Sequence, residues 1–101
     1  MKVVRVELSG SPTPGDTVMI HGSHPIRGGR TTAGWVVKEG NTLEDIVSGL
    51  VWSSGNNNFL GEFEFKPKGN TITIVCSNLV AETVFAGEVR GSSVQIAVEE
   101  L

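Results

Sequence analysis

The sequence predicts an α+β fold in which about six to seven strands form a mainly antiparallel β-sheet or sandwich, with one amphipathic helix packed on it. Three observations support this prediction. Apolar and polar residues alternate through much of the 101-residue chain, as they do in strands that bury one face. Thirteen glycines separate these segments and are typical of turns. Apolar side chains recur at helical spacing over about residues 42–53.

The composition indicates a single domain, residues 1–101. Hydrophobic residues make up 39% of the chain and charged residues 19%, and a chain of this length can bury a core without metal or disulfide support. The net charge of −3 provides no basic surface for nucleic acid or for an anionic membrane. The apolar runs are too short to span a membrane. Cys76 is the single cysteine, so no intrachain disulfide is expected.

Three strands are expected before the helix. Residues 3–8 alternate between apolar and polar side chains, which predicts a half-buried strand. A loop rich in proline and glycine separates this strand from a second one at 17–21. An exposed loop at 22–30 then leads to a third strand at 31–38, which is expected to pair with the second.

The helix has a recognisable start and an apolar stripe. Thr42 is a good N-cap, and Asp45 follows three residues later, which resembles a capping box with Asp in place of Glu. Gly55 is expected to end the helix in a left-handed conformation. The side chains that share one face of the helix are Leu43, Ile46, Val47, Leu50 and Val51.

Further strands are expected after the helix. Residues 59–66 and 71–76 alternate and are joined by a turn at 67–70, which predicts a hairpin. The alternation is less regular in 80–89, and a last strand is expected at 92–99. Cys76 falls on the inward face of its strand and is expected to act as a small buried hydrophobe.

No group of residues predicts catalysis or a bound cofactor. His21 and His24 lie three positions apart, but a metal site needs three or four ligands and no further ligand has suitable spacing. We therefore interpret them as two loop histidines. A catalytic histidine would also need a partner nucleophile or carboxylate, and no motif supplies one. The sequence thus predicts a protein that is not an enzyme and carries no metal or cofactor.

Two arginines flank a pair of glycines in the segment from Arg27 to Arg30. A phosphate-binding loop would be followed by a helix, whereas a strand is expected here. Two interpretations stay open: a flexible loop tip, or a loop that contacts an acidic neighbouring subunit.

Trp52 is the most unusual residue of the helix. At about 100° per residue it lies nearly opposite the apolar stripe, on the polar side with Asp45 and Ser48. A large aromatic residue in that position is either covered by a loop or contacts a partner. Trp35 belongs either to the core or to the edge of the same patch. The interface candidates are Trp52, Trp35, Arg27, Arg30 and Asp45.

Residues 35–46 resemble the opening of a LysM peptidoglycan-binding repeat over about a dozen residues. That repeat continues with a second helix and a closing strand. Here an asparagine-rich turn and a hairpin are expected instead, so we interpret the resemblance as coincidental.

A longer stretch resembles a different family. Gly15–Val18 opens a strand, Gly40–Leu43 begins the helix after a strand that ends at Lys38, and Gly69–Ile74 turns into a return strand. This order is similar to a small α+β module of bacteriophage tail, baseplate and other virion proteins, and it covers residues 10–76. The resemblance implies a structural role without catalytic residues. Residues 80–101 have no counterpart in the module.

These observations predict a bacteriophage virion structural protein: a tail, baseplate or capsid-decoration subunit located in the virion and assembled in the host bacterial cytoplasm. Its expected partners are other copies of itself, in a homo-oligomer, and other virion proteins. Residues 1–8 and 92–101 are the segments expected to pair across subunits. The alternative is a carbohydrate- or peptidoglycan-binding module that uses Trp35 and Trp52 as stacking platforms.

Overall fold

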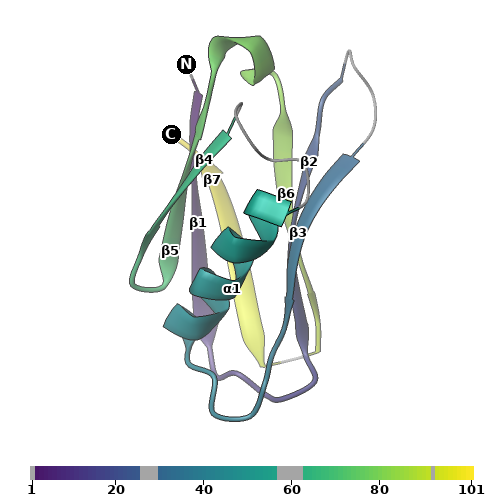
Figure 1. The fold of residues 1–101 in the computed structure, drawn as a ribbon, viewed down its shortest axis with the longest axis vertical. Helices are drawn as coiled ribbons and strands as arrows, with labels where there is room; N and C mark the ends of the chain where they lie inside the picture. The colour runs from purple at the N-terminus through teal and green to yellow at the C-terminus, as the bar shows by residue number, and fades with distance from the viewer. Residues whose placement is uncertain (1, 26–29, 57–62, 92) are drawn as a thin grey trace.

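The computed structural model describes residues 2–25, 30–56, 63–91 and 93–101. Within them the chain forms two antiparallel sheets and one α-helix (Figure 1), which confirms the predicted α+β class. One sheet has the order β4-β5-β1-β7 and the other the order β3-β2-β6. The elements are β1 (Lys2–Gly10), β2 (Thr17–Ser23), β3 (Arg30–Val36), α1 (Leu43–Asn56), β4 (Phe63–Lys68), β5 (Thr71–Cys76), the 3-10 helix η1 (Asn78–Val80), β6 (Val84–Arg90) and β7 (Val94–Glu100).

The core lies between the two sheets and follows the alternation of the strands. In β1 and β5 every second residue is buried, as predicted, and in β2 the inward pair Val18 and Ile20 is fully buried. Cys76 is also fully buried, which confirms its expected place in the core. The largest fully buried side chains are Leu8, Ile20, Ile46, Leu50, Ile72, Ile74, Val4, Val6, Val18 and Val47.

Helix α1 covers the opening between β3 and β4, one strand from each sheet (Figure 1). A 14-residue helix is marginal on its own, so packing of its apolar stripe stabilises it. Its start is held as predicted: the backbone N–H of Asp45 donates to Thr42 Oγ1 at 3.2 Å, and the backbone N–H of Thr42 donates to Asp45 Oδ2 at 2.8 Å. The capping box is therefore confirmed with aspartate in the glutamate position.

The prediction that Gly55 ends the helix is wrong. The helix continues to Asn56, and Gly55 is not among the glycines with positive φ. Two buried serines hold the last turn in place. The Ser54 hydroxyl donates to the carbonyl of Val51, and Ser53 Oγ accepts from the backbone N–H of Gly34 on β3.

The hairpin predicted after the helix is present, with a tighter turn than expected. Residues 59–62 lie outside the described part of the chain, and β4 extends through Pro67 to Lys68. Proline is tolerated there because β4 is an edge strand. The turn itself is Gly69–Asn70, with Gly69 at a φ of +59°, a conformation that favours glycine.

The prediction that residues 1–8 pair across subunits is wrong for the described residues 2–8. Strand β1 is hydrogen-bonded to β5 on one side and to β7 on the other, so neither of its edges is open to a neighbour. Strand β7 is an edge strand and pairs with β1 alone. The irregular segment before it resolves into η1 followed by β6, which pairs with β2.

Candidate functional site

The outer face of α1 carries an open groove of about 500 Å³. Three of the five interface candidates meet there: Trp35 from the end of β3, and Asp45 and Trp52 from α1. The remaining lining residues are Lys38, Ser48 and Gly49. We call this surface the α1 groove. It joins residues that are up to 17 positions apart in the sequence.

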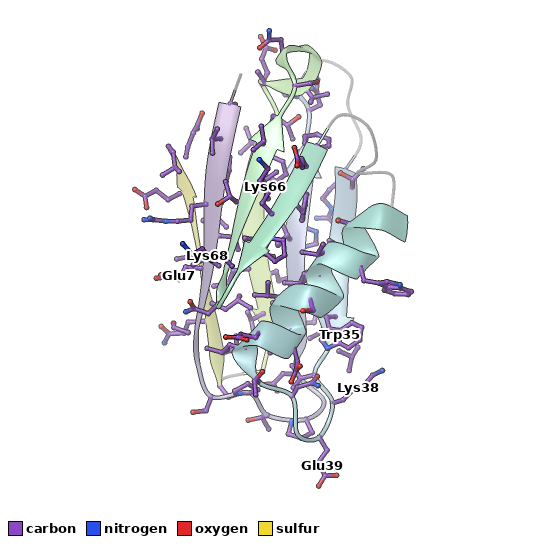
Figure 2. All side chains as sticks on the ribbon, turned by 60° about the vertical axis from the view of Figure 1, so that its left-hand side comes forward. Glu7, Trp35, Lys38, Glu39, Lys66 and Lys68 are labelled. Atoms are coloured by element: carbon purple, nitrogen blue, oxygen red, sulfur yellow. The ribbon has the colours of Figure 1, made fainter. Side chains whose placement is uncertain are left out.

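Trp35 forms the fixed wall of the α1 groove. Its Nε1–H donates to Asn41 Oδ1 at 3.1 Å, and the same oxygen accepts the backbone N–H of Lys38 at 2.8 Å. The indole lies on the helix at Gly49, where a Cβ atom would come within 2.2 Å of the ring. The Lys38 ammonium lies 4.8 Å from the ring centroid, a cation–π contact. Figure 2 shows Trp35 against α1 with Lys38 beside it.

Trp52 also lines the α1 groove, and 66% of its surface is exposed. Of the two alternatives left open by the sequence, the loop-covered tryptophan is therefore wrong. Asp45 and Ser48 are exposed in the same groove. The first turn of α1 carries two acidic residues, and its last turn carries no basic one.

The two arginines proposed as interface candidates do not line this groove. Arg27 and the glycine pair lie outside the described residues, so the two interpretations of their loop stay open. Arg30 is exposed at the start of β3. It lies five residues before Trp35, a distance of about 17 Å along an extended strand.

A second polar cluster lies on the β3-β2-β6 sheet and was missed by sequence reasoning. His21 is buried within β2, as the strand predicted at 17–21 requires, and its interpretation as a loop histidine is wrong. Its Nδ1 lies 2.8 Å from Thr32 Oγ1, and its Nε2 lies 2.8 Å from Glu88 Oε1. Glu88 is 67 positions away in the sequence, and alternation within a strand does not reveal which strands pair.

The His21 and Arg90 side chains hydrogen-bond to Glu88 and lower the pKa of its carboxyl group from the ordinary value of 4.5. A lowered carboxyl pKa contributes stability above the ordinary pKa, and this contribution is lost as the pH falls through the lowered value. We expect Glu88→Gln to reduce the free energy of unfolding at about pH 6, with the difference from the wild type shrinking towards about pH 3. Urea unfolding at several pH values measures this difference. Glu82→Gln, at an exposed position outside the cluster, is the control. If Glu88→Gln lost the same stability at both pH values, the lowered pKa of Glu88 would not be the cause of the loss.

The remaining chemical candidates are Cys76 and His24. No group of three or more His, Cys, Asp or Glu side chains in the described part of the chain is arranged to hold a metal ion. Burial raises the pKa of the Cys76 thiol, which keeps it protonated and a poor nucleophile. His24 is half-buried beyond the end of β2.

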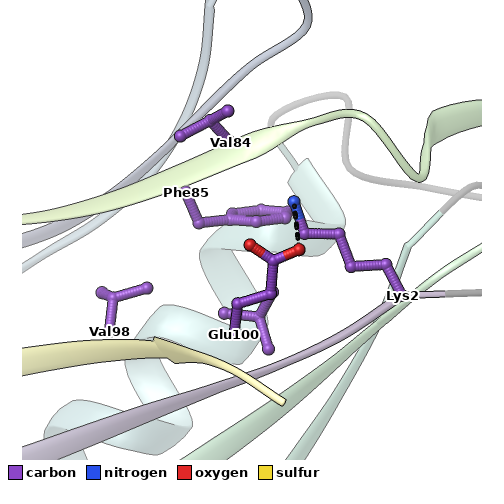
Figure 3. Close-up of a pocket in the computed structure, with 6 residues that line it drawn as sticks. Lys2, Val84, Phe85, Val98 and Glu100 are labelled. Carbon is purple, nitrogen blue, oxygen red and sulfur yellow. Dashed lines mark ion pairs between the residues drawn. The ribbon is translucent and has the colours of Figure 1, made fainter.

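A smaller hollow of about 160 Å³ is lined by residues of β1, β6 and β7. Figure 3 shows Val84 and Phe85 of β6 facing Val98 and Glu100 of β7. Lys2 of β1 closes one side. Its ammonium donates to the Thr83 carbonyl at 2.5 Å and lies 3.4 Å from Glu100 Oε1. These contacts link β1 to β7 and to the residue that precedes β6.

Comparison of the chain with protein-family models, with curated proteins and with solved structures found no match. The described residues define the class of the protein by their geometry: a two-sheet α+β sandwich with a tryptophan-lined groove on α1, the one α-helix among them. None of the described helices combines the length and the apolar character that a membrane span requires.

Proposed function

We propose that this chain is a structural subunit of a bacteriophage particle, in the tail, the baseplate or the capsid decoration, and that it acts by binding other subunits. The observation that carries this proposal is the α1 groove, which is lined by an exposed Trp52 and by Trp35, whose indole is hydrogen-bonded to Asn41. Tryptophans in such positions are common anchors of protein–protein interfaces.

The order of the elements supports the phage part of the proposal. A strand pair, a helix and a hairpin follow one another as β2, β3, α1, β4 and β5, the same order as in the virion module that residues 10–76 resemble. The partners in this proposal are other copies of the chain and other virion proteins, within a particle assembled in the host cytoplasm. The open edge of β7 offers a second contact for a neighbouring subunit.

Trp52→Ala should disrupt assembly without affecting the fold. Truncating a central interface tryptophan costs about 2 kcal/mol or more of binding free energy, which weakens association about 30-fold or more. Because Trp52 is largely exposed, the free energy of unfolding should change by no more than about 0.5 kcal/mol. Sedimentation velocity at increasing concentration, and co-sedimentation with particles of the phage that encodes the chain, measure the loss.

The matched control is Val84→Ala, which removes an apolar side chain of similar exposure, 61%, from strand β6. It should leave assembly through the α1 groove unchanged. A wild-type protein that stays monomeric at high micromolar concentration and does not bind phage particles would refute the proposal.

A carbohydrate-binding module is the second candidate, and the polar side chains beside Trp52 favour it. Lys38, Asp45 and Ser48 line the groove and could hydrogen-bond a sugar stacked on the exposed indole. Trp52 is the more exposed of the two indoles and is the main platform in this candidate. Tryptophan fluorescence titrated with cell-wall glycan fragments tests this candidate, and an unchanged spectrum removes it.

A further inference from the structure

We infer that the α1 groove recognises an arginine side chain presented by a partner subunit, with Trp52 as the stacking surface and Asp45 as the counter-charge. This inference rests on the proposed function of α1 as a binding face and specifies the chemistry of the partner. It follows from the charges around the groove, from the contact of the Lys38 ammonium with the Trp35 ring, and from the hydrogen bonds of the Asp45 carboxylate.

The charge distribution around the α1 groove favours a cationic occupant. Lys38 and Asp45 line the groove with opposite charges, and Glu39 and Glu44, the sequence neighbours of these two residues, are acidic and exposed. The last turn of the helix has no basic residue to offset them. Charge complementarity of this kind selects partners and speeds association. An acidic segment would meet like charges at this face.

One indole of the groove already contacts a cation, the side chain of Lys38. The Lys38 ammonium lies 4.8 Å from the centroid of Trp35, within the range of a cation–π interaction. Trp52 supplies a second indole in the same groove, and about two thirds of its surface is exposed. A guanidinium group stacks on an indole more readily than an ammonium because it is planar and weakly hydrated.

Asp45 can pair with a guanidinium without losing its role in the helix. Its Oδ2 accepts both hydrogen bonds from Thr42 in the capping box. Within the described residues Oδ1 accepts no hydrogen bond. Gly49 adds no side chain between Asp45 and Trp52, so the long arginine side chain has room to lie along the helix.

The test uses N-acetyl-arginine methylamide as the probe and N-acetyl-citrulline methylamide as its neutral, nearly isosteric control. Both are titrated at one ionic strength, and binding is followed by NMR on the indole N–H of Trp52, assigned with Trp52→Phe. We expect arginine to bind in the millimolar range and citrulline to bind at least about fivefold more weakly. Equal shifts with the two probes, or no shift with either, would overturn the inference.

Two variants sharpen the result. Asp45→Asn removes the charge and keeps an oxygen for the cap, so arginine binding should weaken at least about threefold while citrulline binding stays unchanged. Circular dichroism verifies that the helix is intact. Lys38→Gln removes a like charge and should strengthen arginine binding about twofold. Unchanged arginine binding in both variants would overturn the electrostatic basis of the inference.

The outcomes for the two proposals can be separated. If Trp52→Ala abolishes assembly but arginine and citrulline bind equally, the groove is an interface and the inference of an arginine partner is refuted. If arginine is preferred but Trp52→Ala leaves assembly unchanged, the cation site is supported and the assembly role of the groove is refuted.

Discussion

Gly49→Ala should destabilise the protein and displace the Trp35 indole from the α1 groove. An added Cβ would lie 2.2 Å from Cδ2 and 2.7 Å from Cγ of Trp35, and Cγ cannot move away without the whole side chain. Overpacking of this kind costs about 1–3 kcal/mol. Helix propensity returns at most about 1 kcal/mol. We therefore expect a net loss of about 1–2 kcal/mol, measured by urea unfolding.

The matched control is Gly55→Ala in the same helix, where an added Cβ meets no atom within 4 Å. This variant should be neutral or slightly more stable, because it gains helix propensity without a clash. Loss of the Asn41 hydrogen bond in Gly49→Ala should also shift the Trp35 indole N–H resonance. If the two variants had equal stability, the position of the Trp35 indole would not require the absence of a side chain at residue 49.

Gly10→Ala should destabilise the protein more than Gly49→Ala does. Gly10 has a φ of +89°, and an added Cβ would lie 2.2 Å from the backbone oxygen of Ser93. The left-handed conformation costs an alanine about 1–2 kcal/mol. The overlap with a main-chain oxygen adds about 1–3 kcal/mol. Thermal unfolding should show a loss of about 3 kcal/mol in total.

Gly15→Ala separates the two contributions. Gly15 has a φ of +94° and open space around the added Cβ, so backbone strain is the only destabilising effect expected in this variant. It should therefore lose about 1–2 kcal/mol. The excess loss in Gly10→Ala then measures how tightly the end of β1 approaches the start of β7, where the Ser11 N–H also donates to the Ser93 carbonyl. An equal loss in both variants would contradict a close approach there.

Local patterns in the sequence were sufficient for the elements and for much of the core. The alternation of β1 and β5 predicts which side chains are buried, because side chains of a strand point to opposite faces in turn. The spacing from Thr42 to Asp45 predicts the capping box, since both groups lie within one helical turn. The angle of Trp52 around the helix predicts its exposure for the same reason.

The features that were predicted wrongly or missed depend on contacts between distant residues, which no local pattern in the sequence encodes. The central position of β1 depends on the order of the strands in the two sheets. Its two neighbours, β5 and β7, come from distant parts of the chain. The last turn of α1 depends on a hydrogen bond between Ser53 and Gly34 across two elements. His21 and Glu88 meet because β2 pairs with β6.

The sequence by itself determined the fold class, the helix start and the outward direction of Trp52, because these follow from repeats of two and 3.6 residues. The tertiary structure decided what surrounds that tryptophan. It laid Trp35 on the bare backbone of Gly49 and placed Lys38 over the ring. A groove needs two walls from different elements, and their distance is set by the packing of α1 against β3.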